Sequence, residues 1–154
     1  MDFHIVDDDE CMCTFYALLS ENLNFTAQTY LGSEEYLEFF NSDEYVPPKL
    51  AILTDVRMPY KSGYELMDIV REQYPGQRFV VLTGSPEVRA GNEVPCLYLV
   101  KPVSIVKLKK VFDAVSRCAE EGSNKNPIGC ASIDDRCEFC HTSWHCPKET
   151  EFTC

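Results

Sequence analysis

Four short apolar runs in the first hundred residues each lead into a polar or charged side chain. The clearest run, Ala51 to Thr54, leads into Asp55 and then into a turn at Met58-Pro59. The other three run from His4 to Val6 before Asp7, from Phe79 to Leu82 before Thr83, and from Leu97 to Val100 before Lys101. Short apolar runs of this kind are typical of strands buried on both faces. Parallel strands end at one edge of their sheet, so we expect these polar side chains to gather there.

The segments between the apolar runs have helical spacing. Strands are predicted at residues 2–6, 25–30, 50–54, 78–82 and 96–100, and helices at 10–22, 33–41, from 62 to Pro75, and 104–120. The predicted inward residues are Phe15, Leu18, Leu19 and Leu23 in the first helix, Leu66, Ile69 and Val70 in the third, and Ile105, Leu108, Phe112 and Val115 in the last. Alternating strands and helices indicate an α/β fold with a parallel sheet between two helical layers.

Local motifs predict where the helices begin. Ser62 with Glu65 has the form of a capping box, and Ser33 and Ser104 are candidate caps for the helices that follow them. Asp9 is expected to act as a helix-start acid. Only about a dozen residues, including Gly91 and Pro95, separate the fourth predicted strand from the fifth, so any helix between them is short.

Composition divides the chain and excludes some functions. Residues 1–121 contain all the strand and helix patterns, whereas residues 122–154 read as a linker and a Cys/His-rich tail that has too few aliphatic residues for a core. The formal net charge is −11, with 25 acidic and 14 basic residues, which argues against direct binding to nucleic acid. No run approaches the length of a membrane span, and the N-terminus lacks a signal-peptide pattern. We therefore expect a cytoplasmic location without membrane insertion.

Four motifs in this order resemble the receiver domain of bacterial two-component response regulators. They are Val6-Asp7-Asp8-Asp9, Thr54-Asp55-Val56-Arg57-Met58-Pro59 with Gly63, Leu82-Thr83-Gly84, and Val100-Lys101-Pro102. The resemblance covers residues 2 to about 120, and it is closest to stand-alone receivers of the chemotaxis type. It implies a doubly wound, flavodoxin-like sheet of five parallel strands in the order 2-1-3-4-5. The interval between Thr83 and Lys101 is shorter than is usual in the family. The missing residues fall on the fourth helix.

The residue types suit phosphoryl transfer. A carboxylate such as Asp55 can attack phosphorus and form an acyl phosphate. The clustered acids would repel a phosphoryl group, so a divalent cation is needed; Mg²⁺ prefers oxygen ligands, which Asp7, Asp8 and Asp55 provide. The resemblance implies that the backbone carbonyl of Arg57 is a further ligand. Lys101 and Thr83 would contact the phosphoryl oxygens.

The resemblance also implies a switch residue and partners. Tyr98 lies three residues before Lys101, where such regulators carry an aromatic switch; an ordinary half-buried strand aromatic is the alternative. The expected phosphoryl donor is a sensor histidine kinase or a phosphotransfer protein, and the output is contact with an unknown downstream protein. The chain would be a phosphoacceptor with autocatalytic phosphotransfer and dephosphorylation only, not a conventional enzyme.

The tail supports a second hypothesis. Five of the nine cysteines lie in the last 25 residues, and Cys137 and Cys140 have the spacing of a zinc knuckle. The candidate ligands are Cys130, Cys137, Cys140, His141, His145 and Cys146. Zn²⁺ is the first expectation and an iron-sulfur cluster the second, and free thiols in an unordered tail are the alternative to both. A metal or redox sensor that uses the receiver fold as a scaffold is therefore the alternative function. A small hydrolase on the same fold is a weaker third.

Overall fold

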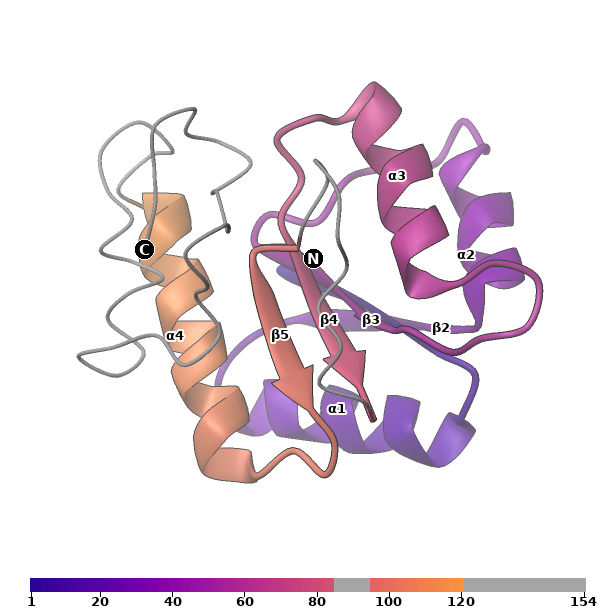
Figure 1. Ribbon diagram of the computed structural model, residues 1–154. Helices are drawn as coiled ribbons and strands as arrows, with labels where there is room; N and C mark the ends of the chain where they lie inside the picture. Colours follow the sequence, from indigo (N-terminus) through magenta and orange to yellow (C-terminus); the bar gives the residue numbers. More distant parts are fainter. Residues whose placement is uncertain (85–94, 121–154) are drawn as a thin grey trace, which may run out of the picture.

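The computed structural model describes residues 1–84 and 95–120, in which strands and helices alternate along the chain (Figure 1). The strands are β1 Phe3–Asp7, β2 Ala27–Leu31, β3 Ala51–Asp55, β4 Phe79–Thr83 and β5 Leu97–Val100. The helices are α1 Glu10–Asn22, α2 Ser33–Phe40, α3 Gly63–Gln73 and α4 Ile105–Glu120. The label α4 therefore belongs to the last predicted helix.

All five strands pair in parallel in the order β2-β1-β3-β4-β5, which confirms the predicted fold class. Four strands extend one residue past the predicted end, and in β1, β3 and β4 the added residue is the polar one after the apolar run, which still pairs with a neighbour. Asp7 pairs with Leu31 and Asp55 with Leu82, while Thr83 pairs with Val100. The polar side chains thus belong to the sheet itself, and their backbones are held by its ladder.

The prediction for the second strand was wrong by two residues at its start. Asn24 adopts a left-handed conformation with φ of 64°, and the Phe25 amide donates to the Ser20 carbonyl, so the turn after α1 continues further than expected. Thr26 is also used in this turn, where its amide and hydroxyl both donate to the Asp2 carboxylate. Strand pairing with β1 therefore begins at Ala27.

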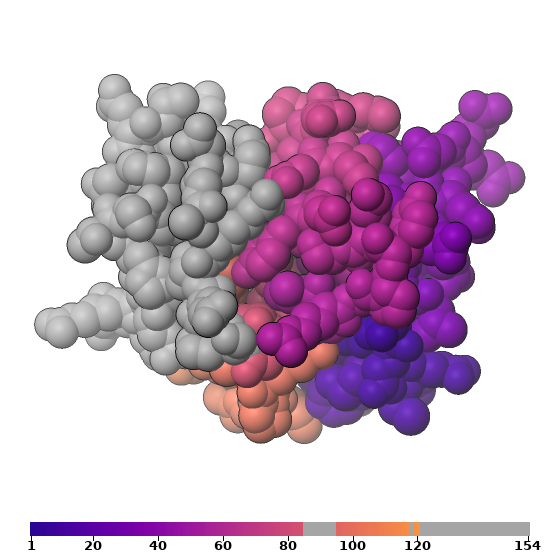
Figure 2. Space-filling model, turned by 45° about the vertical axis from the view of Figure 1, so that its right-hand side comes forward, coloured from indigo at the N-terminus to yellow at the C-terminus, as the bar shows by residue number. Residues whose placement is uncertain are grey.

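The sheet separates two hydrophobic cores. One core joins it to α1 and α4 and includes Phe3, Ile5, Tyr16, Leu19, Leu53, Val81, Leu99, Leu108 and Phe112. The other joins it to α2 and α3 and includes Val6, Tyr36, Phe40, Ile52, Leu66, Met67 and Phe79. In the space-filling view, the segment around α3 forms the middle of one face and the segment around α2 lies beside it (Figure 2).

The buried faces of α1 and α4 differ from the prediction. In α1 the buried residues are Cys13, Tyr16, Leu19 and Ser20, whereas Phe15 and Leu18 are exposed. These four buried residues are themselves spaced at i, i+3, i+6 and i+7. Cys13 and Ser20 are small or polar, however, so the apolar pattern did not indicate them. In α4 the first predicted core residue, Ile105, is 56% exposed, because it lies at the helix start beyond the sheet edge.

Three of the four predicted helix starts are confirmed. Asp9 caps α1 by accepting from the amides of Cys11 and Met12, Ser62 and Glu65 form the capping box of α3, and Ser104 accepts from the Lys107 amide at α4. The prediction for Ser33 was wrong, because it is the first residue of α2 and its hydroxyl bonds instead to the loop after β3.

Two predictions fall outside the described residues: the short fourth helix, and the linker and tail at 122–154. Within residues 1–84 and 95–120, no helix combines the length and the apolar character needed to cross a lipid bilayer.

His4 is buried in an aromatic cluster beneath α2. Its Nδ1 lies 3.0 Å from the Tyr36 hydroxyl, which lies 3.2 Å from the Tyr45 hydroxyl. The rings of Tyr30 and Phe39 also pack edge-on to the imidazole. Burial lowers the pKa of His4 to about 4, from an ordinary value of 6.5, because the cluster disfavours the charged imidazolium. The folded protein therefore holds this histidine neutral.

We expect the free energy of unfolding to fall as the pH drops from about 6.5 toward 4. In that window the unfolded chain binds a proton at His4 that the folded chain excludes, at a cost of at most about 3 kcal/mol. Urea denaturation of the wild type and of His4→Phe at several pH values checks this. The difference between the two curves should grow toward high pH, and parallel curves across this window would contradict the assignment.

Candidate functional site

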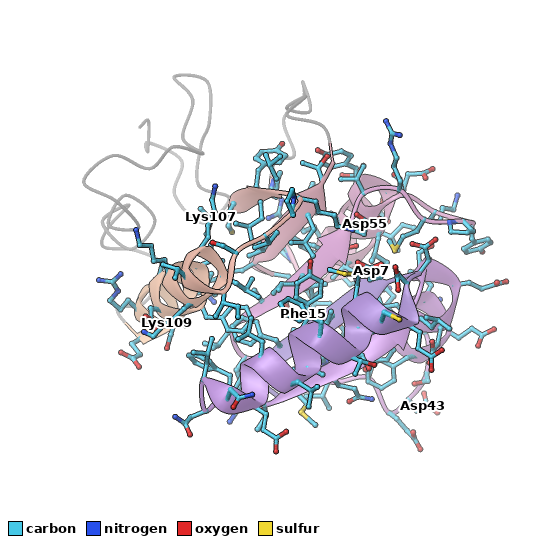
Figure 3. The ribbon with its side chains drawn as sticks, turned by 90° about the horizontal axis from the view of Figure 1, so that it is seen from below. Asp7, Phe15, Asp43, Asp55, Lys107 and Lys109 are labelled. Atoms are coloured by element: carbon cyan, nitrogen blue, oxygen red, sulfur yellow. The ribbon has the colours of Figure 1, made fainter. Side chains whose placement is uncertain are left out.

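Four of the predicted site residues meet at one edge of the sheet. Asp7, Asp55 and Thr83 are the last residues of β1, β3 and β4, and Lys101 directly follows β5. Figure 3 shows Asp7 and Asp55 at the end of the sheet that lies next to the start of α1. The parallel topology therefore brings together side chains that are up to 94 residues apart in the sequence.

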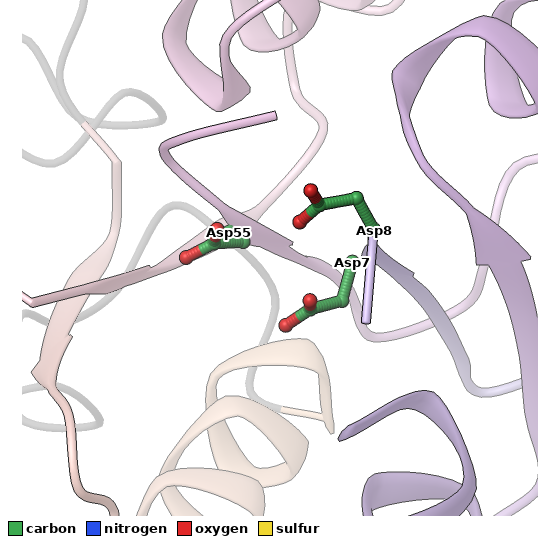
Figure 4. A group of neighbouring side chains, drawn as sticks. All are labelled: Asp7, Asp8 and Asp55. Atoms are coloured by element: carbon green, nitrogen blue, oxygen red, sulfur yellow. The ribbon is translucent and has the colours of Figure 1, made fainter. Parts of the chain in front are cut away.

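Asp7, Asp8 and Asp55 form a cluster of three carboxylates. Each offers one oxygen, and these oxygens lie within 4.8 Å of one another (Figure 4). Asp7 is 1% exposed and Asp55 is 8% exposed, whereas Asp8 lies on the surface. A group of oxygen ligands that is closed on one side and open to solvent on the other suits a hard divalent cation.

Lys101 supplies the positive charge of the site. Its Nζ lies 2.9 Å from Oδ1 of Asp55 and 3.4 Å from Oδ2 of Asp7, and its side chain is 28% exposed. Partial burial by itself would lower the pKa of Lys101, but the hydrogen bond and charge of Asp55, together with the charge of Asp7, outweigh burial and raise it. The ammonium is therefore fixed between two strands in its charged form.

Burial and neighbouring groups shift the pKa of the Asp7 carboxyl in opposite directions. Its burial is the largest effect and raises its pKa, and the Asp55 charge adds to this. The Asp9 amide, which donates to Oδ1 of Asp7 at 3.0 Å, and the Lys101 ammonium both act to lower the pKa. The net pKa is raised, because burial outweighs the two groups that stabilise the charged carboxylate.

Backbone hydrogen bonds join the residues that surround these side chains. The Lys101 amide donates to the Thr83 carbonyl at 2.8 Å, and the Val56 amide donates to the Leu82 carbonyl at 3.1 Å. The peptide bond between Lys101 and Pro102 is cis. The loops after β3 and β5 therefore both begin with a bond to the end of β4, which fixes the position of the buried Thr83 relative to both charged residues.

Gly63 allows the start of α3 to approach Asp55. Its amide donates to the Val56 carbonyl at 3.0 Å, and a β-carbon at this position would overlap the carbonyl oxygen of Asp55. The obstacle is backbone, so a larger residue forces the helix or the strand end to move. By contrast, a β-carbon at Gly84 would meet no atom within 4 Å among the described residues.

Replacing Gly63 with alanine should therefore destabilise the fold by about 2–3 kcal/mol and displace the Asp55 carboxylate. Gly84→Ala is the matched control, because it adds the same methyl group at the neighbouring strand end without a clash. Thermal and urea denaturation measure both variants. Equal stability of the two would show that α3 accommodates the added methyl group.

No model of a known protein family matches the chain. The transcriptional regulatory protein FixJ of Azorhizobium caulinodans is 28% identical over 129 residues, which cover 80% of this chain and 59% of that relative. The chain thus spans less than two thirds of the length of this curated relative.

Several solved structures match the chain over nearly their whole length. A response regulator receiver domain of Clostridium thermocellum is 20% identical, with a TM-score of 0.63, and the match covers 77% of this chain and 96% of that one. A CheY-like receiver domain of Methanospirillum hungatei is 22% identical, with a TM-score of 0.62, over 78% and 97%. The chemotaxis regulator CheY4 of Vibrio cholerae is 22% identical, with a TM-score of 0.62, over 73% and 96%.

The chain has the fold of response-regulator receiver domains. The strand order, the parallel pairing and these structural matches agree, and the sequence resemblance predicted the same fold. These structural matches are all below 25% identity, so they show the fold and not the roles of individual residues.

The loop after β3 in this receiver fold contains a strained residue. Tyr60 has φ of 72°, and the Lys61 amide donates to the Pro59 carbonyl at 2.9 Å across it, which makes a γ-turn. Ser33 holds both sides of this turn, donating to the Pro59 carbonyl and accepting from the Lys61 amide at 3.0 Å each. Tyr60 is 65% exposed, so packing of its side chain offsets little of the free-energy cost of the positive φ in this turn.

Tyr60→Gly is expected to raise the free energy of unfolding by up to about 1 kcal/mol, since glycine adopts positive φ without steric cost. Asn24→Gly is the matched control, because asparagine already tolerates its φ of 64°. Urea denaturation compares the two changes. A loss of stability in Tyr60→Gly larger than in the control would show that the exposed ring contributes more than the turn costs.

The remaining predicted residues lie as follows. Arg57 is exposed two residues after Asp55, and Tyr98 is buried in β5, paired with Val81 on the strand beside it. Their roles as a metal-ligand carbonyl and as a switch stay predictions. The predicted tail ligands, Cys130, Cys137, Cys140, His141, His145 and Cys146, lie outside the described residues.

Two residues near the site were missed from the sequence. Ser33 was interpreted as a helix cap, although its hydroxyl tethers the loop after β3; nothing local in the sequence indicates this contact. Tyr16 was passed over because Phe15 and Leu18 gave the stronger apolar pattern, but the spacing of Cys13, Tyr16 and Leu19 could have identified the buried face.

Proposed function

We propose that this chain is a phosphorylation-dependent signalling receiver that accepts a phosphoryl group on Asp55. The observation that carries the proposal is the joining of Asp55 and Asp7, on different strands, by the ammonium of Lys101, with Asp8 beside them. The receiver fold supports it, and so does the likeness to a regulator such as FixJ. Residues 1–121 would form the receiver domain, and residues 122–154 a linker and tail.

Asp55 is the proposed nucleophile. A carboxylate oxygen of Asp55 forms a bond to phosphorus as the bond between phosphorus and the donor's leaving atom breaks, and the leaving group keeps the electron pair and takes up a proton. The acyl phosphate is later lost when water attacks phosphorus, which releases inorganic phosphate and regenerates the carboxylate. Such transfer depends on positioning and charge neutralisation more than on covalent help from the protein.

Lys101 and Thr83 are the proposed partners of the phosphoryl oxygens. The Lys101 ammonium already lies at hydrogen-bond distance from the Asp55 oxygen, so it can follow the charge onto the phosphoryl group. The Thr83 side chain is buried at the end of the adjacent strand, and its carbonyl accepts from the Lys101 amide. Any movement of one of these two residues is therefore transmitted to the other.

The donor set fits Mg²⁺. Three carboxylates and one ammonium leave an excess of two negative charges, and oxygens are the ligands that Mg²⁺ prefers. Asp7, Asp8 and Asp55 would hold the ion, with the Arg57 carbonyl as a further ligand. Bound there, Mg²⁺ would supply the charge that lets an anionic phosphoryl donor approach Asp55.

A histidine kinase or a histidine phosphotransfer protein is the proposed donor, and a downstream protein the proposed recipient of the signal. The chain would catalyse only its own phosphorylation and dephosphorylation. The alternative, a metal or redox sensor, depends on tail residues outside the described part. It predicts a response that survives replacement of Asp55.

Mass spectrometry of the full-length protein after incubation with acetyl phosphate tests the proposal. A phosphoryl adduct is expected that requires Mg²⁺ and is absent from Asp55→Asn. Asp43→Asn is the matched control, because this exposed carboxylate lies far from the site in Figure 3 and should leave labelling unchanged. The metal content of the same sample is measured alongside.

Two outcomes would overturn the proposal. One is an adduct that persists in Asp55→Asn; the other is no adduct in the wild type under conditions that keep it folded. Stoichiometric zinc or iron together with no adduct would favour the sensor hypothesis.

A further inference from the structure

The Tyr16 hydroxyl is buried, and no other described residue is its hydrogen-bond partner. The residue lies on the inner face of α1 with none of its surface exposed, within the core that joins the sheet to α1 and α4. Within the part of the chain that the structure describes, its hydroxyl oxygen makes no hydrogen bond. Such a group costs about 1–3 kcal/mol relative to an apolar one of the same shape. Phenylalanine would fill this position without the cost.

The charges that act on this hydroxyl are those of the phosphorylation site. Burial is the main reason that the pKa of Tyr16 is raised to about 12, and Lys101, Asp7 and Asp55 follow as the next influences. Tyr16 in turn is among the groups that act to raise the pKa of Lys101. The hydroxyl therefore lies within electrostatic reach of the site.

Among the described residues, the Lys101 ammonium keeps one hydrogen-bond donor to spare. An ammonium has three N–H groups, and the carboxylates of Asp55 and Asp7 take two of them. A phenolic oxygen can accept the third while its own O–H donates to a carboxylate. When Asp55 becomes an acyl phosphate, the negative charge moves outward to the phosphoryl oxygens, and Lys101 must turn with it.

We propose that Tyr16 is a positioning residue for phosphoryl transfer, whose hydroxyl accepts a hydrogen bond from Lys101 as the ammonium turns from Asp55 to the phosphoryl group. This inference rests on the proposed function. On this inference, the buried Tyr16 hydroxyl, which has no hydrogen-bond partner among the described residues, gains one during phosphoryl transfer. A neutral acceptor holds the ammonium without competing with the phosphoryl charge.

Tyr16→Phe tests the inference, with Tyr30→Phe as its matched control. The Tyr30 hydroxyl is also buried and without a hydrogen bond in the described residues, but it lies in the core under α2 and α3, where Tyr45 and Glu35 are the groups that influence it. Each variant should be at least as stable as the wild type in urea. The rate of Mg²⁺-dependent labelling by acetyl phosphate should fall roughly three- to tenfold in Tyr16→Phe alone, which is the value of one hydrogen bond.

A second measurement separates positioning from a merely structural role. In a Lys101→Met background, Tyr16→Phe should cause no further loss of rate, because its effect passes through Lys101. Wild-type rates in Tyr16→Phe, or losses that multiply in the double variant, would overturn the inference and leave the proposed function intact. A wild type that accepts no phosphoryl group would overturn both.

Discussion

The Lys101 ammonium lies between the carboxylates of Asp55 and Asp7, and the site depends on this pairing of charges across strands. Two buried acids at neighbouring strand ends would repel one another, and burial alone disfavours their charged forms. One ammonium lowers that cost but does not remove it, as the raised pKa of Asp7 shows. The remaining negative charge makes the site ready for a cation and, through it, for an anionic donor.

Much of this arrangement could be predicted because the parallel sheet turns sequence order into position. An apolar run followed by one polar residue locates a strand end, and four such runs locate one edge. For β1, β3 and β4 the prediction ended the strand one residue early, since the apolar run ended before the backbone ladder did: Asp7, Asp55 and Thr83 all still pair. The position of these side chains at one sheet edge was therefore predicted correctly even where the strand boundary was not.

Contacts that depend on packing could not be read from the sequence. Ser33 begins a helix and so resembled a cap, but its hydroxyl is used by a loop that follows it by more than twenty residues. Ile105 has the right spacing for the inner face of α4, yet the sheet ends before it. In α1, polar and small residues occupy the buried face, so apolar periodicity selected Phe15 and Leu18 instead. In each case, a segment that is distant in the sequence determines what surrounds the residue.

The contact between Gly63 and the Asp55 carbonyl has a mechanical consequence. The nearest atom to a β-carbon at Gly63 would be the Asp55 carbonyl oxygen, which is backbone and cannot change rotamer to absorb a displacement. The capping box of Ser62 and Glu65 stiffens the same helix start. The end of β3 and the start of α3 are thus coupled through backbone atoms, and a displacement of Asp55 along that direction has to move the first turn of α3 with it.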